Sequence, residues 1–157
     1  MDATTINNNT LIAEFMGWKK LNHGFYDWEK PKEGEVRYST NDQHRWYEEG
    51  VSAIMSERDD HDVRYMGFDE SWEWLMPVVE KIESIDIVGG LIINSFSFRI
   101  DRAWVQIEMH PQIDIGFNFD NQLGWSEDIE HFGDTRMEAV YGAVVKFINW
   151  YNSNNSK

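Results

Sequence analysis

The stretch at residues 58–62, RDDHD, holds the densest group of potential metal ligands in the chain. Asp59, Asp60 and Asp62 offer carboxylate oxygens and His61 offers an imidazole, and these ligand types suit a divalent ion. Side chains adjacent in sequence rarely converge on one ion without ligands from elsewhere in the chain. We therefore predict a solvated acidic turn and no metal site, with a metal-dependent hydrolase as the less favoured alternative.

Sequence motifs of familiar enzymes are missing from the chain. It contains no GxxxxGK[ST] phosphate loop, no GxGxxG fingerprint, no HExxH zinc helix and no GxSxG nucleophile elbow. It has no cysteine, which removes thiol nucleophiles, thiolate metal sites and disulfides. Glu130 and His131 are adjacent, but neighbours on a strand point to opposite faces of its sheet. The sequence thus predicts no catalytic residue and no cofactor, and it favours a non-enzymatic protein.

The chain is strongly acidic, and its charge is unevenly placed. It carries 28 Asp and Glu against 14 Lys and Arg, a net charge of -14. Residues 1–56 hold 9 acids and 6 bases, whereas residues 57–157 hold 19 acids and 8 bases. This balance argues against direct binding to nucleic acid or to an anionic membrane. Two interpretations remain: a solvated acidic surface that keeps an aromatic-rich protein in solution, or an acidic face that competes for a basic groove, as nucleic-acid mimics do.

Targeting signals are also missing. No apolar run approaches the roughly 20 residues of a membrane span. The N-terminus has neither the basic region nor the apolar stretch of a secretory signal. We expect a cytoplasmic protein without membrane association.

The two clearest helices lie in the second half of the chain. Thr135 and Glu138 predict a capping box for the last helix, with a frayed tail at residues 153–157. Its predicted buried stripe is Met137, Val140, Tyr141, Val144, Ile148 and Tyr151. The other helix lies in DESWEWLMPVVEKIESI, residues 69–85, with Asp69 or Ser71 as its cap, and it is either kinked at Pro77 or begins later than the cap suggests. Its predicted buried face is Trp72, Leu75, Met76, Val79 and Ile82.

Trp74 lies about 200° around that helix from Trp72, so one face cannot bury both. Two interpretations of Trp74 stay open: a second layer of packing, or an aromatic surface for a partner, where tryptophan is enriched.

Alternation of apolar and polar residues predicts the strands. These are expected at residues 63–68, 91–100, 103–109, 113–119 and 128–132, with a tight turn at Asp101 and Arg102. A short first helix, capped by Asn9 or Thr10, is expected to end at Gly17. Residues 18–62 predict a long irregular connection with a possible strand at 35–39. The fold class is α+β: one domain over residues 1–152, with an antiparallel sheet of about four strands packed with two or three helices.

Three segments carry a resemblance. LIAEFMG (11–17), ESWEWLMPVVEKIES (70–84) and MEAVYGAVVKFINWYN (137–152) occur in this order, and with them the chain resembles small bacteriophage and prophage proteins of the phage αβα-sandwich type. The resemblance covers about a quarter of the chain. It implies helices packed on an antiparallel sheet and the cytosol of a bacterial host, and it offers no catalytic residues to carry over. Residues 111–133 depart from the pattern.

Two functions follow as expectations. The first is a non-enzymatic accessory protein that binds and modulates a host component, in its sharper form an acidic inhibitor that occupies the basic nucleic-acid groove of a defence protein. Its candidate partner-binding residues are Asp59, Asp60, Asp62, Trp74, Glu127 and Asp128. The alternative is a protein that sequesters a nucleotide signal through stacking aromatics and phosphate-binding arginines. Its candidate residues are Trp28, Arg37, Arg45, Trp46, Arg64 and Arg102.

Overall fold

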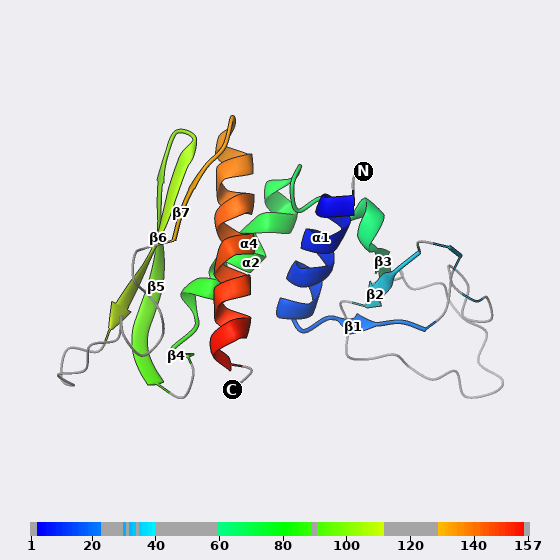
Figure 1. The fold of residues 1–157 in the computed structure, drawn as a ribbon, viewed down its shortest axis with the longest axis horizontal. Helices are drawn as coiled ribbons and strands as arrows, with labels where there is room; N and C mark the ends of the chain where they lie inside the picture. Colours follow the sequence, from blue (N-terminus) through cyan, green and yellow to red (C-terminus); the bar gives the residue numbers. More distant parts are fainter. Residues whose placement is uncertain are drawn as a thin grey trace. The chain divides into compact units, whose positions relative to one another are not determined.

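A computed structural model describes residues 3–22, 30, 32–33, 35–39, 60–88, 91–111 and 129–155. The chain divides into two compact units, Met1–Met66 and Gly67–Lys157 (Figure 1). The expectation of a single domain over residues 1–152 stays a prediction.

The first unit combines a helix with a small antiparallel sheet. Its elements are α1 (Ala3–Phe15), β1 (Lys19–Lys20), β2 (Arg37–Ser39), β3 (Asp60–Asp62) and the 3-10 helix η1 (Val63–Tyr65). The strands lie in the order β1-β2-β3, and β2 is antiparallel to both neighbours. Strand β2 falls within the predicted 35–39 segment, whereas the sequence pattern indicated neither β1 nor β3. The connection therefore contains short strands, and its residues 40–59 lie outside the described part of the chain.

Helix α1 begins at Ala3, so the prediction of a cap at Asn9 or Thr10 is wrong. Asn9 lies inside the helix with no exposed surface, and its Nδ2 donates to the carbonyl oxygens of Val63 at 3.2 Å and Met66 at 2.9 Å. The amide thus attaches α1 to the end of η1 in the same unit. Gly17 has φ 81, which confirms it as the left-handed residue after the helix.

The strand predicted at residues 63–68 is wrong. Asp62 is the N-cap of η1, and its carboxylate accepts a hydrogen bond from the backbone N–H of Arg64. An Asp side chain that bonds the backbone two residues ahead favours a turn over an extended strand. This local bond ends β3 and starts η1.

The second unit is a sheet covered by two helices. Its elements are α2 (Trp72–Glu83), β4 (Ile87–Val88), β5 (Leu91–Asp101), β6 (Trp104–Pro111), β7 (Ile129–Phe132) and α4 (Arg136–Asn155). The strands lie in the order β4-β5-β6-β7, and each pair of neighbours is antiparallel. Helix α4 contacts β6 and β7, and α2 contacts β5 and α4 (Figure 1). The predicted α+β class is confirmed.

The β5–β6 hairpin and β7 follow the sequence pattern closely. The hairpin turns at Arg102, whose φ of 51 gives the positive value that a tight turn requires. Strand β7 falls within the predicted 128–132 segment. The strand predicted at 113–119 lies outside the described residues.

Helix α4 confirms the capping box and extends the predicted element. The Glu138 carboxylate accepts from the Thr135 N–H at 3.0 Å, and the Thr135 hydroxyl accepts from the Glu138 N–H at 3.2 Å. The helix continues to Asn155, three residues beyond the predicted end at Asn152, and polar side chains of its last turns bond to carbonyls four residues earlier. These side chains are Asn149, Ser153, Asn154 and Asn155.

The buried face of α4 differs from the prediction and includes two alanines. Val140, Val144 and Ile148 are buried as expected, whereas Met137, Tyr141 and Tyr151 are only partly buried. The rest of the buried face is Ala139, Ala143 and Phe147. Small residues bring the helix close to the sheet, and Phe147 then packs edge-on against Phe96 of β5 at 4.7 Å between ring centroids.

Helix α2 begins at Trp72 after the N-cap Ser71, with Pro77 inside it. Leu75, Val79 and Ile82 are buried as predicted, and Val78 completes the stripe. The prediction is wrong for Trp72 and Met76, each of which is 38% exposed. Val78 extends the buried stripe on one side, and Trp72 and Met76 lie beyond its opposite edge.

Candidate functional site

The RDDHD segment is built into the first unit as a structural corner. Arg58 and Asp59 lie outside the described residues, and Asp60 is in β3 opposite Ser39. Asp62 is only 4% exposed, and both of its oxygens accept from the guanidinium Nε of Arg64, at 3.0 and 2.9 Å. This bond raises the pKa of Arg64 above its ordinary value. Asp62 therefore holds the β3–η1 corner together.

A second ion pair adjoins this corner. Arg37 is the cross-strand partner of Asp62 and is 8% exposed. Its guanidinium lies 3.4 Å from the carboxylate of Glu35, which also accepts from the backbone N–H of Lys32 at 2.9 Å. We name Glu35, Arg37, Asp62 and Arg64 the charge cluster. Its two positive and two negative charges compensate one another, as buried charges must.

The charge cluster bears directly on the nucleotide alternative. Arg37 and Arg64 are both engaged by carboxylates, so a phosphate would have to displace Glu35 or Asp62. Arg102 is exposed at the β5–β6 turn of the second unit. Trp28, Arg45 and Trp46 lie outside the described residues. Within the described part of the first unit, Arg37 and Arg64 lie in one cluster, but carboxylates already engage both.

Buried groups elsewhere in the first unit also serve packing. The Tyr38 hydroxyl donates to Glu14 at 2.8 Å, and burial, followed by this contact, raises the pKa of Tyr38. Trp18 and His61 lie with ring centroids 6.5 Å apart. No group of three His, Asp or Glu side chains among the described residues could hold a metal ion.

The predicted partner-binding residues are only partly described. Glu127 and Asp128, like Asp59, lie outside the described residues. Trp74 is half-buried and contacts Phe68 edge-on at 5.4 Å, with its ring close above Gly67. Trp74 thus packs in a second layer within its own unit. The more exposed tryptophan of this helix is Trp72, which sequence reasoning had placed inside.

The exposed side of α2 combines apolar and acidic groups. Trp72 and Met76 are partly exposed, and Glu73, Glu80 and Glu83 are exposed on the same side of the helix. We name these five residues the α2 outer face. Among the described residues, no cation lies within ion-pair distance of these three carboxylates. The face therefore presents apolar surface beside uncompensated negative charge.

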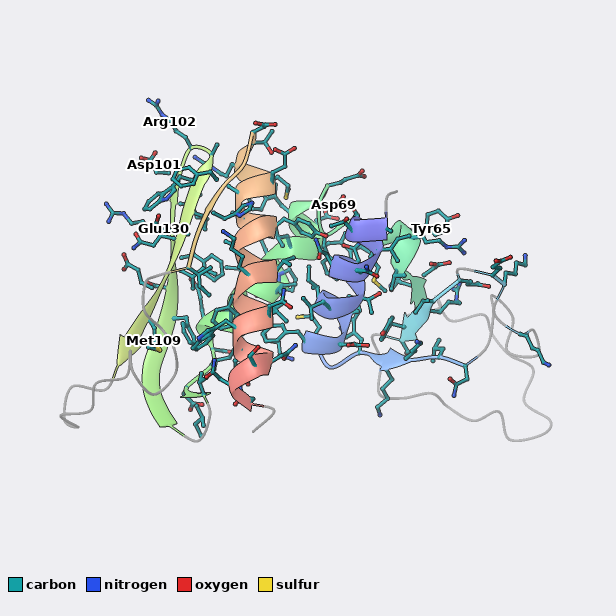
Figure 2. All side chains as sticks on the ribbon, in the orientation of Figure 1. Tyr65, Asp69, Asp101, Arg102, Met109 and Glu130 are labelled. Carbon is teal, nitrogen blue, oxygen red and sulfur yellow. The ribbon has the colours of Figure 1, made fainter. Side chains whose placement is uncertain are left out.

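The strands of the second unit expose a second mixed surface. Cross-strand pairing aligns Asp101, Trp104 and Phe132 in one row and Arg99, Gln106 and Glu130 in the next, with Glu108 beyond them opposite Ser97. Because side chains alternate along a strand, the residues of these rows lie on the other face of the sheet from Val105, Ile107 and His131. Figure 2 shows Asp101 and Glu130 on the side of the sheet that faces away from α4. We name Arg99, Asp101, Trp104, Glu108, Glu130 and Phe132 the open sheet face.

Aromatic contacts organise the open sheet face. The Arg99 guanidinium lies 5.9 Å from the centroid of the Trp104 ring, and Trp104 lies 6.5 Å from Phe132. Phe132 is 71% exposed. Sequence reasoning did not select these residues, although a tryptophan on the polar side of the alternating segment 103–109 was the available signal.

Strand β7 is joined closely to α4 by His131. A Cβ added to Gly142 would lie 2.1 Å from Nε2 of the His131 ring, so glycine is required at this contact. Lys146 Nζ donates to the carbonyl oxygen of Glu130 at 2.8 Å, which satisfies a backbone acceptor of this edge strand. Burial, and then the charge of Lys146, lower the pKa of His131.

No protein family, curated protein or solved structure matches this chain. Within the described part of the chain, no helix has both the length and the apolar character needed to span a membrane.

Proposed function

We propose that this chain is a non-enzymatic accessory protein of bacteriophage type, which binds a basic host protein through the acidic surface of its second unit. The phage character rests on the three sequence segments that resemble phage proteins. In the sharper form of the proposal, the acidic surface occupies the nucleic-acid groove of a host defence protein and inhibits it.

The α2 outer face is the observation that carries the proposal. It presents Trp72 and Met76 between the carboxylates of Glu73, Glu80 and Glu83. Binding energy at protein interfaces concentrates in partly buried aromatic residues, while surrounding charges select the partner and speed its association. A face with this composition suits a basic partner that offers an apolar contact.

Pro77 adds a main-chain feature to the same side of the helix. Proline has no N–H, so the carbonyl of Glu73 cannot receive the usual helical hydrogen bond from four residues ahead. Both residues are exposed. The face thus offers a backbone acceptor beside its carboxylates to a partner rich in Lys and Arg donors.

Charge is concentrated in the unit that carries this face. Residues 67–157 hold 15 Asp and Glu against 6 Lys and Arg. Such a field attracts a basic partner over long range and weakens as salt is added. In the first unit, by contrast, the charge cluster is compensated and serves the fold.

The proposal can be tested with matched charge variants. The test variant, Glu73→Gln/Glu80→Gln/Glu83→Gln, removes three charges from the α2 outer face with little change in shape. The control variant, Glu33→Gln/Asp86→Asn/Asp134→Asn, removes three exposed charges elsewhere. Tagged proteins are incubated with bacterial lysate at low and high salt, and retained proteins are identified by mass spectrometry. We expect a nucleic-acid-handling protein that is retained at low salt by the wild type and the control, and lost from the test variant.

Association and dissociation rates are then measured with the purified partner. The test variant should mainly lower the association rate and its salt dependence, whereas Trp72→Ala should mainly raise the dissociation rate. Equal retention by test and control variants would remove the α2 outer face from the proposal. A further variant that neutralises Asp59, Asp60, Glu127 and Asp128 tests the acidic segments that the sequence indicated. If the α2 test variant and this second acidic variant both bind the partner as the wild type does, the acidic-inhibitor function is wrong.

A further inference from the structure

The open sheet face has the features of a built contact surface. Among the described residues of the second unit, Phe132 is the most exposed large apolar side chain, and it lies beside Trp104 in the same cross-strand row. Trp104 is itself held by the guanidinium of Arg99. Two aromatic rings are therefore presented on β-strands, and one of them is in contact with a guanidinium.

Acidic groups surround these rings. Asp101 and Glu130 are exposed and Glu108 is partly exposed, and no described cation forms an ion pair with any of them. Arg99 is the one positive side chain of the open sheet face. The surface around the rings therefore carries a net negative charge.

We propose that the open sheet face binds a basic segment of a protein partner, in which an apolar side chain is flanked by Lys or Arg. The apolar side chain covers Phe132 and the exposed edge of Trp104. The flanking cations reach Asp101 on one side and Glu108 or Glu130 on the other. Aromatic anchors within a charged rim are the usual arrangement of a protein interface.

Charge decides between this occupant and two others. A second copy of the chain would bring Asp101, Glu108 and Glu130 against the same carboxylates of its partner. A single-stranded nucleic acid also stacks on aromatic rings, but its phosphates would meet these carboxylates and the acidic field of the whole chain. A basic peptide segment is the occupant whose charge complements the face.

This surface is independent of the proposed function, because it lies on the opposite side of the sheet from the helices and shares no residue with the α2 outer face. A host partner lost from the α2 variant could still bind here, and the reverse also holds. The two surfaces can therefore fail separately.

The experiment uses the full chain and three synthetic peptides. The probe is a 16-residue amphipathic peptide of Lys, Arg, Leu and one Trp, with the apolar residues on one side. One comparison peptide has Ser in place of each Leu and of the Trp, and the other has Glu in place of each Lys and Arg. Titrations are followed by amide and indole N–H chemical shifts and by calorimetry. Of the three peptides, we expect only the probe to bind, with the largest chemical-shift changes at Trp104 and Phe132.

Two variants locate the contact. Phe132→Ser changes an exposed side chain and should weaken probe binding at least fivefold while the melting temperature stays near that of the wild type. Asp101→Asn/Glu130→Gln should weaken binding and flatten its salt dependence, whereas Glu73→Gln/Glu80→Gln/Glu83→Gln should leave the shifts at Trp104 in place. The inference is overturned if Phe132→Ser binds as tightly as the wild type, or if the shifts lie elsewhere. It is also overturned if the peptide without apolar residues or the acidic peptide binds equally well, or if sedimentation shows a dimer that Phe132→Ser dissolves.

Discussion

The contact between His131 and Gly142 predicts a substitution whose effect on stability reverses sign with its neighbour. A Cβ at position 142 would lie 2.1, 2.2 and 2.7 Å from Nε2, Cδ2 and Cε1 of the His131 ring. Non-bonded atoms pack at about 3.5 Å, so the ring must move by about 1.4 Å. Overpacking of this kind costs about 1–3 kcal/mol, against a gain of about 1 kcal/mol when alanine replaces glycine inside a helix.

We therefore expect Gly142→Ala to lower the free energy of unfolding by about 1 kcal/mol in the wild-type background. With His131→Ala the ring is gone, the helix gain is left alone, and Gly142→Ala should raise the free energy of unfolding by about 1 kcal/mol. Urea unfolding followed by circular dichroism of the four proteins measures both effects and their coupling. The reasoning is refuted if Gly142→Ala has the same effect in both backgrounds, or if it stabilises the wild type.

Three further predictions address other contacts. Asn9→Ala should lower the free energy of unfolding by about 1–3 kcal/mol, because two buried carbonyls lose their donor, and the exposed Asn7→Ala is its control in urea unfolding. Arg64→Leu should lower the free energy of unfolding by about 3–5 kcal/mol, because it removes the ion-pair partner of the buried Asp62 carboxylate. The double variant Asp62→Asn/Arg64→Leu should lower it less, because no charge is left at position 62. If thermal unfolding shows the double variant to be the less stable of the two, the unpaired carboxylate is not the cause of the loss. Burial lowers the pKa of His131 below the value near 6.5 of the unfolded chain, so its contribution to stability is complete above about pH 6.5 and is lost as the pH falls through the folded-state value. The difference in stability between the wild type and His131→Gln should therefore shift against the wild type between pH 7.5 and pH 5, and a difference independent of pH would show that burial does not perturb this histidine.

Local signals carried most of the successful predictions. The capping box at Thr135 and Glu138 and the β5–β6 hairpin depend on residues close in sequence, and each was predicted from them. The 3-10 turn after Asp62 was missed because a side chain bonds the backbone there, whereas the pattern of residues 63–68 indicated a strand. Periodicity reports which side of an element is apolar, and it does not report that a side chain competes for the backbone.

Burial depended on partners that the sequence does not name. Trp72 was predicted inside and is partly exposed, because Val78 completes the buried stripe of α2. Trp74 packs against Phe68 in a second layer, which was one of its two interpretations. Asn9 was predicted as a cap because asparagine favours that position, whereas its two acceptors lie more than 50 residues further along the chain. For Asn9, contacts distant in sequence outweighed a local preference.

The sequence identified charged residues of the candidate sites but not how the fold pairs them. Arg37, Asp62 and Arg64 were chosen from the sequence as free charges, and the cross-strand pairing of Arg37 with Asp62 makes them parts of the compensated charge cluster. A count of 28 acids says nothing about which carboxylates are compensated.

In the second unit, carboxylates without a described cation lie beside exposed Trp72 on α2 and beside exposed Phe132 on the sheet. An acidic surface that served only solubility would not require apolar side chains of this size next to its charges, because exposed apolar surface does not favour solubility. A partner gains from both, since burying the rings supplies affinity while the surrounding carboxylates exclude acidic competitors. The pairing of charge with exposed aromatic surface, more than the charge alone, is therefore what distinguishes a binding surface from a solvated one in this protein.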